Sequence, residues 1–365
     1  MKKIKILAVL SIIAMLAISA CAAEPEVITE TVVETQIVEV EAEDGAVTIG
    51  YAAPGLVGGQ INIQETLYRY AQDKGWAVVV TNCNGDAQKQ NDDIDYLISL
   101  GVDAIVTVPQ DSAGICAAAE KAKAADIPFY TIDRSPSGCA INMTLLSDNF
   151  LAGQQSGEEL VAYLTEKYGA PEGKVLEITG DLGQNVGQLR RDGFHDIVDK
   201  NEDIEVIQKV GNWDAALGAE ILREVLVSDP DLDAVYMHSD AVYMNGTLAE
   251  LEAAGKLFQR GEEGHVFLCA VDGSPAGVQA IKDGWADQSS NQPIPDFGRI
   301  VDFVEQELNG EPITEGEYVV EGALWSPAKI VTNADGSLEA FLRTTSVTIE
   351  NAEDPALWAN FGDIK

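Results

Sequence analysis

The sequence predicts an α/β fold of two lobes, each a doubly wound parallel sheet, joined by a multi-segment hinge. Apolar runs of strand length recur at intervals of about 25 to 30 residues. Between them lie stretches in which apolar residues have helical spacing, an alternation typical of parallel sheets covered on both faces. The roughly 320 residues after residue 45 are many for one such sheet, so we expect two lobes.

The expected elements follow one another in a regular order. The expected strands are 47–52, 77–81, 104–108, 128–132, 141–145, 175–179, 204–210, 234–237 and 266–271. The expected helices are 61–74, 88–100, 114–125, 153–168, 214–227, 242–254, 275–282 and 297–308. Asn149 is a residue type favoured as a helix N-cap, so we expect it to begin the helix after the strand at 141–145.

The lobe boundaries are expected near 146–149 and around 288–295, where Pro and polar residues interrupt the alternation. The tail shows little periodicity and is interpreted as a strap over the body. The predicted parts are an N-terminal lobe of 46–147 plus 294–320, a C-terminal lobe of 148–293 plus 321–345, and a tail of 346–365.

Residues 1–21 have the pattern of an export signal, with a basic start, an apolar run and small residues before Cys21. The stretch Ile18-Ser19-Ala20-Cys21 resembles the bacterial lipoprotein cleavage box, which implies a lipid on the Cys21 sulfur. Ordinary cleavage near Ala20 is the alternative. Residues 22–45 are acidic, lack Lys and Arg, and read as a solvated tether. We therefore expect a location outside the cytoplasm, with an anchor to the membrane.

Charge and cysteine content exclude several functions. The formal net charge is −37, and so acidic a chain repels phosphate backbones, which argues against nucleic-acid binding. Cys83, Cys116, Cys139 and Cys269 have no paired spacing typical of a zinc or redox site, so we expect no metal and no cofactor. In an oxidising compartment Cys116 and Cys139 could form a disulfide, and the sequence leaves this question open.

One strand end carries a binding pattern. The apolar run 127–132 ends in Asp133 and Arg134, and ligands of open α/β sheets bind outside the carboxyl ends of strands. A carboxylate and a guanidinium together offer acceptors and donors that match sugar hydroxyls. The alternative is a loop salt bridge of little energetic value.

Nine segments between residues 47 and about 332 form a recognisable series by their order and spacing. They are Val47-Thr-Ile-Gly-Tyr, Tyr96-Leu-Ile-Ser-Leu-Gly-Val-Asp-Ala-Ile-Val, Ile127-Pro with Ile132-Asp133-Arg134, Ser147-Asp148-Asn149 with Gly153, Arg190-Arg-Asp-Gly193-Phe194, Asn212-Trp213-Asp214, Ala234-Val-Tyr with Ser239-Asp240, Val271-Asp272-Gly273 and Gly284-Trp285-Ala-Asp. In these segments the chain resembles sugar-binding proteins of the ribose-binding type, the type I periplasmic binding proteins that serve ATP-driven importers.

The resemblance implies a ligand cleft between the lobes. It implies that Asp133 and Arg134 bind from the first lobe, Arg190, Trp213 and Asp272 from the second, and Gln292 from a hinge segment. Three alternatives stay open: Arg191 replaces Arg190, Trp213 staples the following helix, or Asp272 is a turn or N-cap residue.

The chain also departs from the ribose-binding pattern. Val57, Gly58, Gly59 and Gln60 stand where an Asn and two aromatic rings are usual, and Val108, Ser239 and Val271 replace further polar or aromatic residues. We expect Gln60 and Ser239 in the site, with Asn62 and Gln110 as further polar candidates. The ligand could therefore be another pentose, a hexose, a polyol or a small furanone-like signal.

The predicted function is an extracytoplasmic receptor that binds a small sugar or polyol and delivers it to an ABC transporter permease, acting as a monomer. A receptor that presents its ligand to a membrane sensor kinase is the alternative, and a secreted carbohydrate-active enzyme comes third. The common nucleotide-binding, hydrolase and metalloprotease motifs are missing from the sequence, so we expect no enzyme activity. A sugar-responsive repressor would need a DNA-binding head, which the export signal and tether replace.

Overall fold

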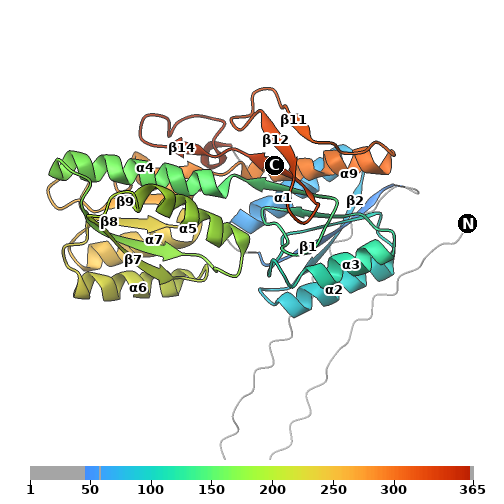
Figure 1. Ribbon diagram of the computed structural model, residues 1–365, viewed down its shortest axis with the longest axis horizontal. Coiled ribbons are helices and arrows are strands. Elements are labelled where there is room, and N and C mark those ends of the chain that lie inside the picture. The colour runs from blue at the N-terminus through green and yellow to red at the C-terminus, as the bar shows by residue number, and fades with distance from the viewer. Residues whose placement is uncertain (1–45, 57–58, 362–365) are drawn as a thin grey trace, which may run out of the picture. The chain divides into compact units, whose positions relative to one another are not determined.

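The computed structural model describes residues 46–56 and 59–361, and Figure 1 shows their arrangement. The predicted signal at 1–21, with Cys21, and the tether at 22–45 lie outside the described residues, as do Val57 and Gly58. Within the described ranges the strands form two sheets covered by helices, so the predicted α/β fold is confirmed.

The first sheet is parallel through its middle and antiparallel at one edge. β1, β2, β3, β4, β5 and β13 run parallel, whereas β11, β12 and β13 pair antiparallel. In spatial order its strands are β11 (Gly316–Tyr318), β12 (Ala328–Thr332), β13 (Leu338–Leu342), β5 (Met143–Ser147), β4 (Phe129–Ile132), β3 (Ala104–Thr107), β1 (Thr48–Ala53) and β2 (Ala77–Asn82).

The second sheet is parallel except for its last strand, since β14 pairs antiparallel with β10. In spatial order its strands are β14 (Thr345–Val347), β10 (Gln288–Asn291), β9 (Phe267–Asp272), β8 (Ala234–Met237), β6 (Gly173–Thr179) and β7 (Ile204–Val210). Its central strands β8 and β9 are buried along their whole length, as expected for strands covered on both faces.

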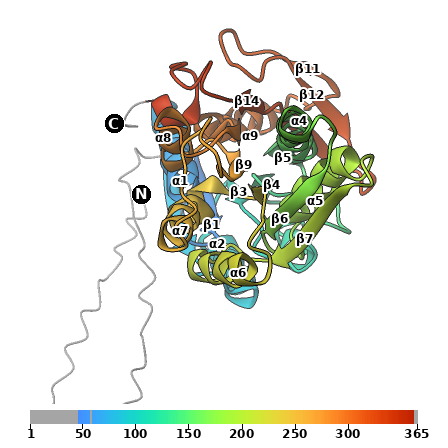
Figure 2. The ribbon, with the colours of Figure 1, turned by 90° about the vertical axis from the view of Figure 1, so that its left-hand side faces the viewer.

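Each sheet with its helices is called a lobe here. The first lobe carries α1 (Gly59–Asp73), α2 (Ala87–Leu100), α3 (Cys116–Ala124), a 3₁₀ turn η1 (Ile294–Arg299) and α9 (Ile300–Leu308). The second carries α4 (Asn149–Tyr168), α5 (Asn185–Val198), α6 (Ala215–Ser228), α7 (Asp240–Ala253) and α8 (Pro275–Lys282). Figure 2 looks along the second lobe, with α4 and α5 side by side over one face of its sheet and α6 and α7 over the other.

Helix ends correct one expectation. Asn149 is the first residue of α4, but the N-cap is Asp148, whose side chain accepts a hydrogen bond from the Leu151 N–H. The Asn149 side chain is therefore free for another partner in the site. Asp and Ser side chains cap α2, α6, α7 and α8 in the same way.

The described chain crosses between the lobes at 147–149, 291–294 and 342–345. Two hydrogen bonds join these segments: Asp148 N donates to the Leu342 carbonyl at 2.8 Å, and Ser147 Oγ donates to Gln292 Oε1 at 3.0 Å. Three adjacent crossing segments form a hinge, about which the two lobes can rotate relative to each other.

One part of the predicted organisation is wrong. The sequence pattern places residues 321–345 in the C-terminal lobe, but β12 and β13 lie in the first sheet, where β13 pairs with β5 in the register Leu338↔Met143. A strand pattern in the sequence predicts that a segment joins a sheet, but it does not predict which sheet. Here β13 pairs with β5 at the edge of the first sheet, and of the strands in this part of the chain only β14 joins the second sheet.

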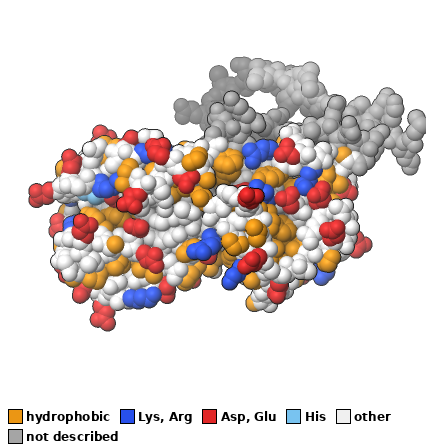
Figure 3. Space-filling model, turned by 90° about the horizontal axis from the view of Figure 1, so that it is seen from above, with side chains coloured by type: hydrophobic (Ala, Val, Ile, Leu, Met, Phe, Trp, Pro, Cys, Tyr) orange, Lys and Arg blue, Asp and Glu red, His pale blue; other side chains and the backbone are white. Residues whose placement is uncertain are grey.

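Cys116 and Cys139 form a disulfide, while Cys83 and Cys269 are buried free thiols. Acidic side chains are spread over the face shown in Figure 3, in keeping with the net charge of the chain. In the described ranges, no helix combines the length and apolar character needed to cross a membrane.

Candidate functional site

A cavity of about 90 Å³ lies between the lobes, where strands of both sheets end. Asp133 follows β4, Ser239 follows β8, and Asp272 is the last residue of β9. All eight ligand-binding residues predicted from the sequence line this cavity, together with seven others. The lining residues are Gly59, Gln60, Ile63, Asp133, Arg134, Val186, Arg190, Trp213, Ser239, Ala241, Val242, Asp272, Gln292, Ile294 and Trp358.

The first lobe contributes a polar group of three residues. Gln60 Nε2, in the first turn of α1, donates to Asp133 Oδ2 at 2.9 Å. Arg134 Nη1 donates to the Pro109 carbonyl at 3.1 Å, and its Nε lies 3.7 Å from Asp133 Oδ2, beyond hydrogen-bond distance. Burial lowers the pKa of Arg134 from its usual value.

Two atoms of this group are buried and unpartnered among the described residues: Gln60 Oε1 and Arg134 Nε. One is an acceptor and the other a donor, and an orphaned buried polar atom costs free energy. A ligand hydroxyl could satisfy either atom, because a hydroxyl both donates and accepts.

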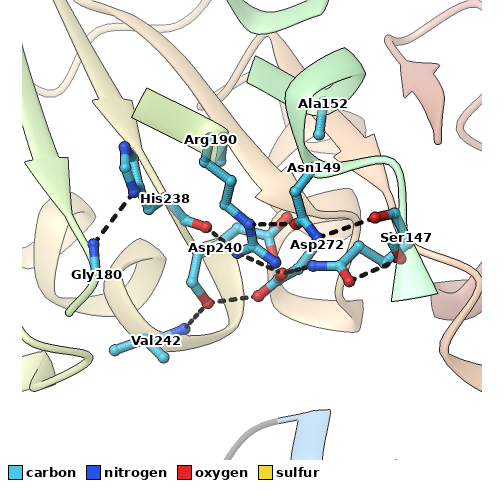
Figure 4. Close-up of polar contacts among 12 residues, drawn as sticks. Ser147, Asn149, Ala152, Gly180, Arg190, His238, Asp240, Val242 and Asp272 are labelled. Carbon is cyan, nitrogen blue, oxygen red and sulfur yellow. Dashed lines mark hydrogen bonds and ion pairs between the residues drawn. The ribbon is translucent and has the colours of Figure 1, made fainter. Parts of the chain in front are cut away.

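Arg190 is the cation of the second lobe. It lies on α5 and is 4% exposed. Its Nε donates to Asn149 Oδ1 at 2.8 Å, and its Nη1 donates to Asp272 Oδ1 at 3.2 Å and to the His238 carbonyl, as Figure 4 shows. Arg191 is instead paired with its neighbour Asp192. The structure thus places Arg190, not Arg191, at the cavity.

Asp272 is the anion of the second lobe. It accepts hydrogen bonds from Arg190, from Ser239 Oγ and from Gln292 Nε2, the last at 2.6 Å. Burial raises the pKa of Asp272. The N-cap of α8 is Ser274, so the N-cap alternative for Asp272 is wrong.

Trp213 forms an apolar wall of the second lobe. Its indole lies over the Arg190 guanidinium at 5.5 Å, and its Nε1 donates to Gln184 Oε1 at 2.8 Å. A Cβ at Gly180 would lie 1.9 Å from the indole, so only glycine leaves room for the ring there. The cavity therefore combines charged groups with an aromatic face, which suits the C–H face of a sugar.

Backbone strain gathers at the same residues. Asp133, Trp213 and Asp272 have φ values of 65°, 58° and 111°, although none is a glycine. Positive φ is uncommon for such side chains and is often retained at functional sites. All three residues line the cavity.

A buried ionic group supports the wall from behind. Glu177 on β6 accepts from His238 at 2.9 Å and lies 3.1 Å from His195 Nε2. Although burial opposes ionisation, the hydrogen bonds from His195 and His238 lower the pKa of Glu177 to about 2. The hydrogen bond to Glu177 raises the pKa of His195 to about 9, whereas burial lowers the pKa of His238.

The lobes also touch directly beside the cavity. Gln184 Nε2 donates to the Gln110 carbonyl at 3.1 Å, and Ser135 N donates to Asn185 Oδ1 at 3.2 Å. Asn185 N donates to Ser112 Oγ at 3.4 Å. These bonds join the start of α5 to first-lobe loops, so the described arrangement is closed around the cavity.

Sequence reasoning missed the apolar lining other than Trp213 and proposed two residues that lie elsewhere. Asn62 and Gln110 do not line the cavity. The missed residue with the largest side chain is Trp358, at the start of η2 (Trp358–Asn360) in the tail. The sequence signal that could have identified Trp358 is its aromatic side chain in a segment that otherwise lacks helix or strand periodicity. In the described residues, no group of His, Cys, Asp and Glu is arranged to hold a metal ion.

Comparison with known proteins yields matches over most of the chain. Residues 49–312 match the family model of the periplasmic binding protein domain. The ribose import binding protein of Bacillus subtilis (strain 168) is 29% identical over 223 residues, 61% of this chain and 68% of that protein. The ribose import binding protein of Salmonella typhimurium is 26% identical over 263 residues, 72% of this chain and 84% of that protein.

Solved structures have the same fold. An ABC transporter solute binding protein from Bacillus halodurans C-125 with bound myo-inositol has a TM-score of 0.71 and 22% identity. The match covers 87% of this chain and 99% of that one. At this identity the likeness shows the fold.

Proposed function

The chain belongs to the periplasmic binding protein family, and we propose that it captures a small sugar or related polyol between its lobes and delivers it to an ABC transporter permease. Relatives named as ribose import binding proteins support this role. The family consists of binding proteins and indicates a location outside the cytoplasm. We infer binding without chemistry.

The observation that carries the proposal is the charge balance of the cavity. It holds two carboxylates, Asp133 and Asp272, and two guanidinium groups, Arg134 and Arg190, with an indole beside them. A neutral polyhydroxyl ligand leaves this balance intact and meets donors and acceptors together. A charged ligand would leave one buried group without a counter-charge, at a cost in free energy.

The size of the cavity supports a single sugar unit. A buried water needs roughly 10–15 Å³ on this measure, so 90 Å³ corresponds to on the order of six to nine waters. A monosaccharide or small polyol fits that volume in the closed arrangement, and an oligosaccharide does not.

The mechanism follows from contacts on both lobes. A ligand that binds Asp133 and Arg134 on one side and Arg190 and Asp272 on the other favours the closed state, because only that state makes both sets of contacts. The closed form would dock on the permease. We propose a monomer that binds no nucleic acid and is anchored through a lipid on Cys21.

A thermal-shift screen of residues 22–365 against pentoses, hexoses and polyols tests the proposal. A ligand at roughly a hundred times its dissociation constant stabilises the native state by about 2.7 kcal/mol. We expect a clear shift with at least one sugar, lost in Asp133→Ala and in Asp272→Ala. No shift with any sugar, or turnover of a bound one, would refute the proposal.

A further inference from the structure

The C-terminal tail, residues 348–361, is fastened to the second lobe over most of its length, and its last residue, Phe361, lies against Arg69 of α1. It leaves β14, which pairs with β10. Ala352 and Leu357 are buried in the apolar core between the second sheet and α6, α7 and α8. Lys282 Nζ on α8 donates to Asn360 Oδ1 at 3.1 Å and to Glu353 Oε2 at 3.2 Å.

The side chain of Trp358 leaves this lobe and enters the other. It is buried in the first-lobe core with Ile63 and Ile294, although its neighbour Leu357 is buried in the second-lobe core. Its backbone N–H donates to Asn291 Oδ1 at 2.9 Å, which holds the tail at the end of β10. Two adjacent residues thus insert into different lobes at the hinge.

Trp358 reaches the cavity beside the first turn of α1. A Cβ built on Gly59 lies 3.4 Å from indole Cη2, so the ring rests directly on the helix backbone there. A residue larger than alanine at 59 would extend into the space that the ring occupies. Trp358 is 7% exposed and lines the cavity with Gly59 and Ile294.

We propose that Trp358 contacts the ligand and determines specificity, and that the tail exists in part to bring this indole from the second lobe to the first-lobe side of the cavity. This inference rests on the proposed sugar-binding function. Trp358 lies beyond residue 312, where the match to the family model ends. Its flat apolar face selects ligands with a C–H face, in addition to the face that Trp213 offers.

The position also links binding to closure. Because Ala352 and Leu357, which precede the ring in the tail, are fixed in the second-lobe core, separation of the lobes would draw the indole away from Gly59 and Ile294. The ring therefore completes the apolar wall of the cavity in the closed state. Loss of the ring removes both a ligand contact and a contact between the lobes.

Fluorine NMR of residues 22–365 labelled with 5-fluorotryptophan tests the proposal. The five tryptophan resonances are assigned from single Trp→Phe variants. D-Ribose, L-arabinose, D-galactose, D-allose and myo-inositol are titrated separately. We expect the sugar that shifts the Trp213 resonance to shift that of Trp358 with the same saturation curve, while Trp76 and Trp285 stay unchanged.

Calorimetric titration of variants gives the second readout. Trp358→Ala should raise the Kd of that sugar tenfold or more, and Trp285→Ala, which removes an indole from the second-lobe core surface, should leave it within twofold. If Trp358→Ala fails to fold, the affinity of Trp358→Phe and the NMR titration of the wild-type protein still test whether Trp358 contacts the ligand.

The outcomes separate the two proposals. A shift at Trp213 without one at Trp358, together with unchanged affinity in Trp358→Phe and Trp358→Ala, overturns the specificity role and leaves sugar binding standing. No shift at Trp213 with any of the five probes overturns sugar binding for this set, and the inference on Trp358 falls with it.

Discussion

Arg190 and Asp272 form a buried ion pair across the floor of the cavity, with Nη1 and Oδ1 3.2 Å apart. Their side chains are 5% and 12% exposed, and each has further partners that hold it in place. Asn149 orients the guanidinium, and Ser239 and Gln292 orient the carboxylate. The charged groups are therefore positioned before a ligand arrives, which reduces the cost of binding.

Replacement of Asp272 by Asn should weaken both folding and binding. The change keeps the shape of the side chain but removes the charge that faces Arg190. We expect a loss of stability of roughly 1–3 kcal/mol and a rise in Kd of roughly 10- to 100-fold. Chemical denaturation and calorimetric titration measure the two effects.

Asp287→Asn is the matched control for this substitution. Asp287 is also buried in the second lobe, where it pairs with Arg260 at 3.2 Å and His265 at 2.9 Å, but it does not line the cavity. It should lose stability and keep its affinity. Equal losses of affinity in both variants would show that Asp272 acts through folding alone.

The polar part of the site could be predicted from the sequence because a charged side chain that directly follows a buried strand lies at the sheet edge where ligands bind. Asp133, just after β4, and Asp272, at the end of β9, follow that rule. Arg190 was expected from the resemblance, but the choice between it and Arg191 required the structure, since a helix turns the two neighbours to different faces and the sequence does not fix the register. Gln60 was predicted only as a substitute for residues usual in the family.

Gln60→Ala should reduce affinity with little change in stability. The Gln60 Nε2 donates a hydrogen bond to Asp133, its Oε1 is buried without a hydrogen-bond partner among the described residues, and the residue lines the cavity, so the main loss is a ligand contact. We expect a rise in Kd of roughly tenfold, equivalent to about 1.4 kcal/mol. Gln64→Ala, one turn further along α1 and outside the cavity lining, is the control and should bind normally. A wild-type Kd in Gln60→Ala contradicts the assignment.

The alternation of strands and helices predicted the core of both lobes because that signal is local. The positions of β12, β13 and the tail could not be read in the same way. The position of β13 depends on the edge of the first sheet at β5, and the position of the tail depends on the contact between the Trp358 indole and Gly59. Such contacts join residues far apart in the chain, such as Leu338 with Met143, and periodicity along the chain does not encode them.

Glu177→Gln should return His195 toward its ordinary titration. The hydrogen bond to Glu177 raises the pKa of His195 from 6.5 to about 9. Because the folded-state pKa is the higher one, the stability from this pair is complete below about pH 6.5 and is lost as pH rises through about 9. NMR titration of the imidazole should show the pKa falling, and unfolding between pH 6.5 and 9 should depend less on pH.

His265 provides the internal control for that titration. It is held by Asp287 rather than Glu177, and the hydrogen bond to Asp287 raises its pKa against the effect of burial. Its titration should be the same in wild type and Glu177→Gln. An unchanged His195 pKa in the variant would contradict the pairing with Glu177.

Gly153→Ala should disturb the site through the contact between α4, which carries Gly153, and α5, which carries Arg190. A Cβ at Gly153 would lie 2.2 Å from the Arg190 carbonyl oxygen and 2.7 Å from the Phe194 nitrogen, so α4 and α5 could not keep their distance. Overpacking of this kind costs roughly 1–3 kcal/mol, and displacement of the Arg190 backbone should also raise Kd. Gly55→Ala, where an added Cβ meets nothing within 4 Å, should leave both unchanged. Denaturation midpoints and sugar titrations of the two variants measure the effect, and a Gly153→Ala protein as stable as Gly55→Ala would show that the helices can separate without cost.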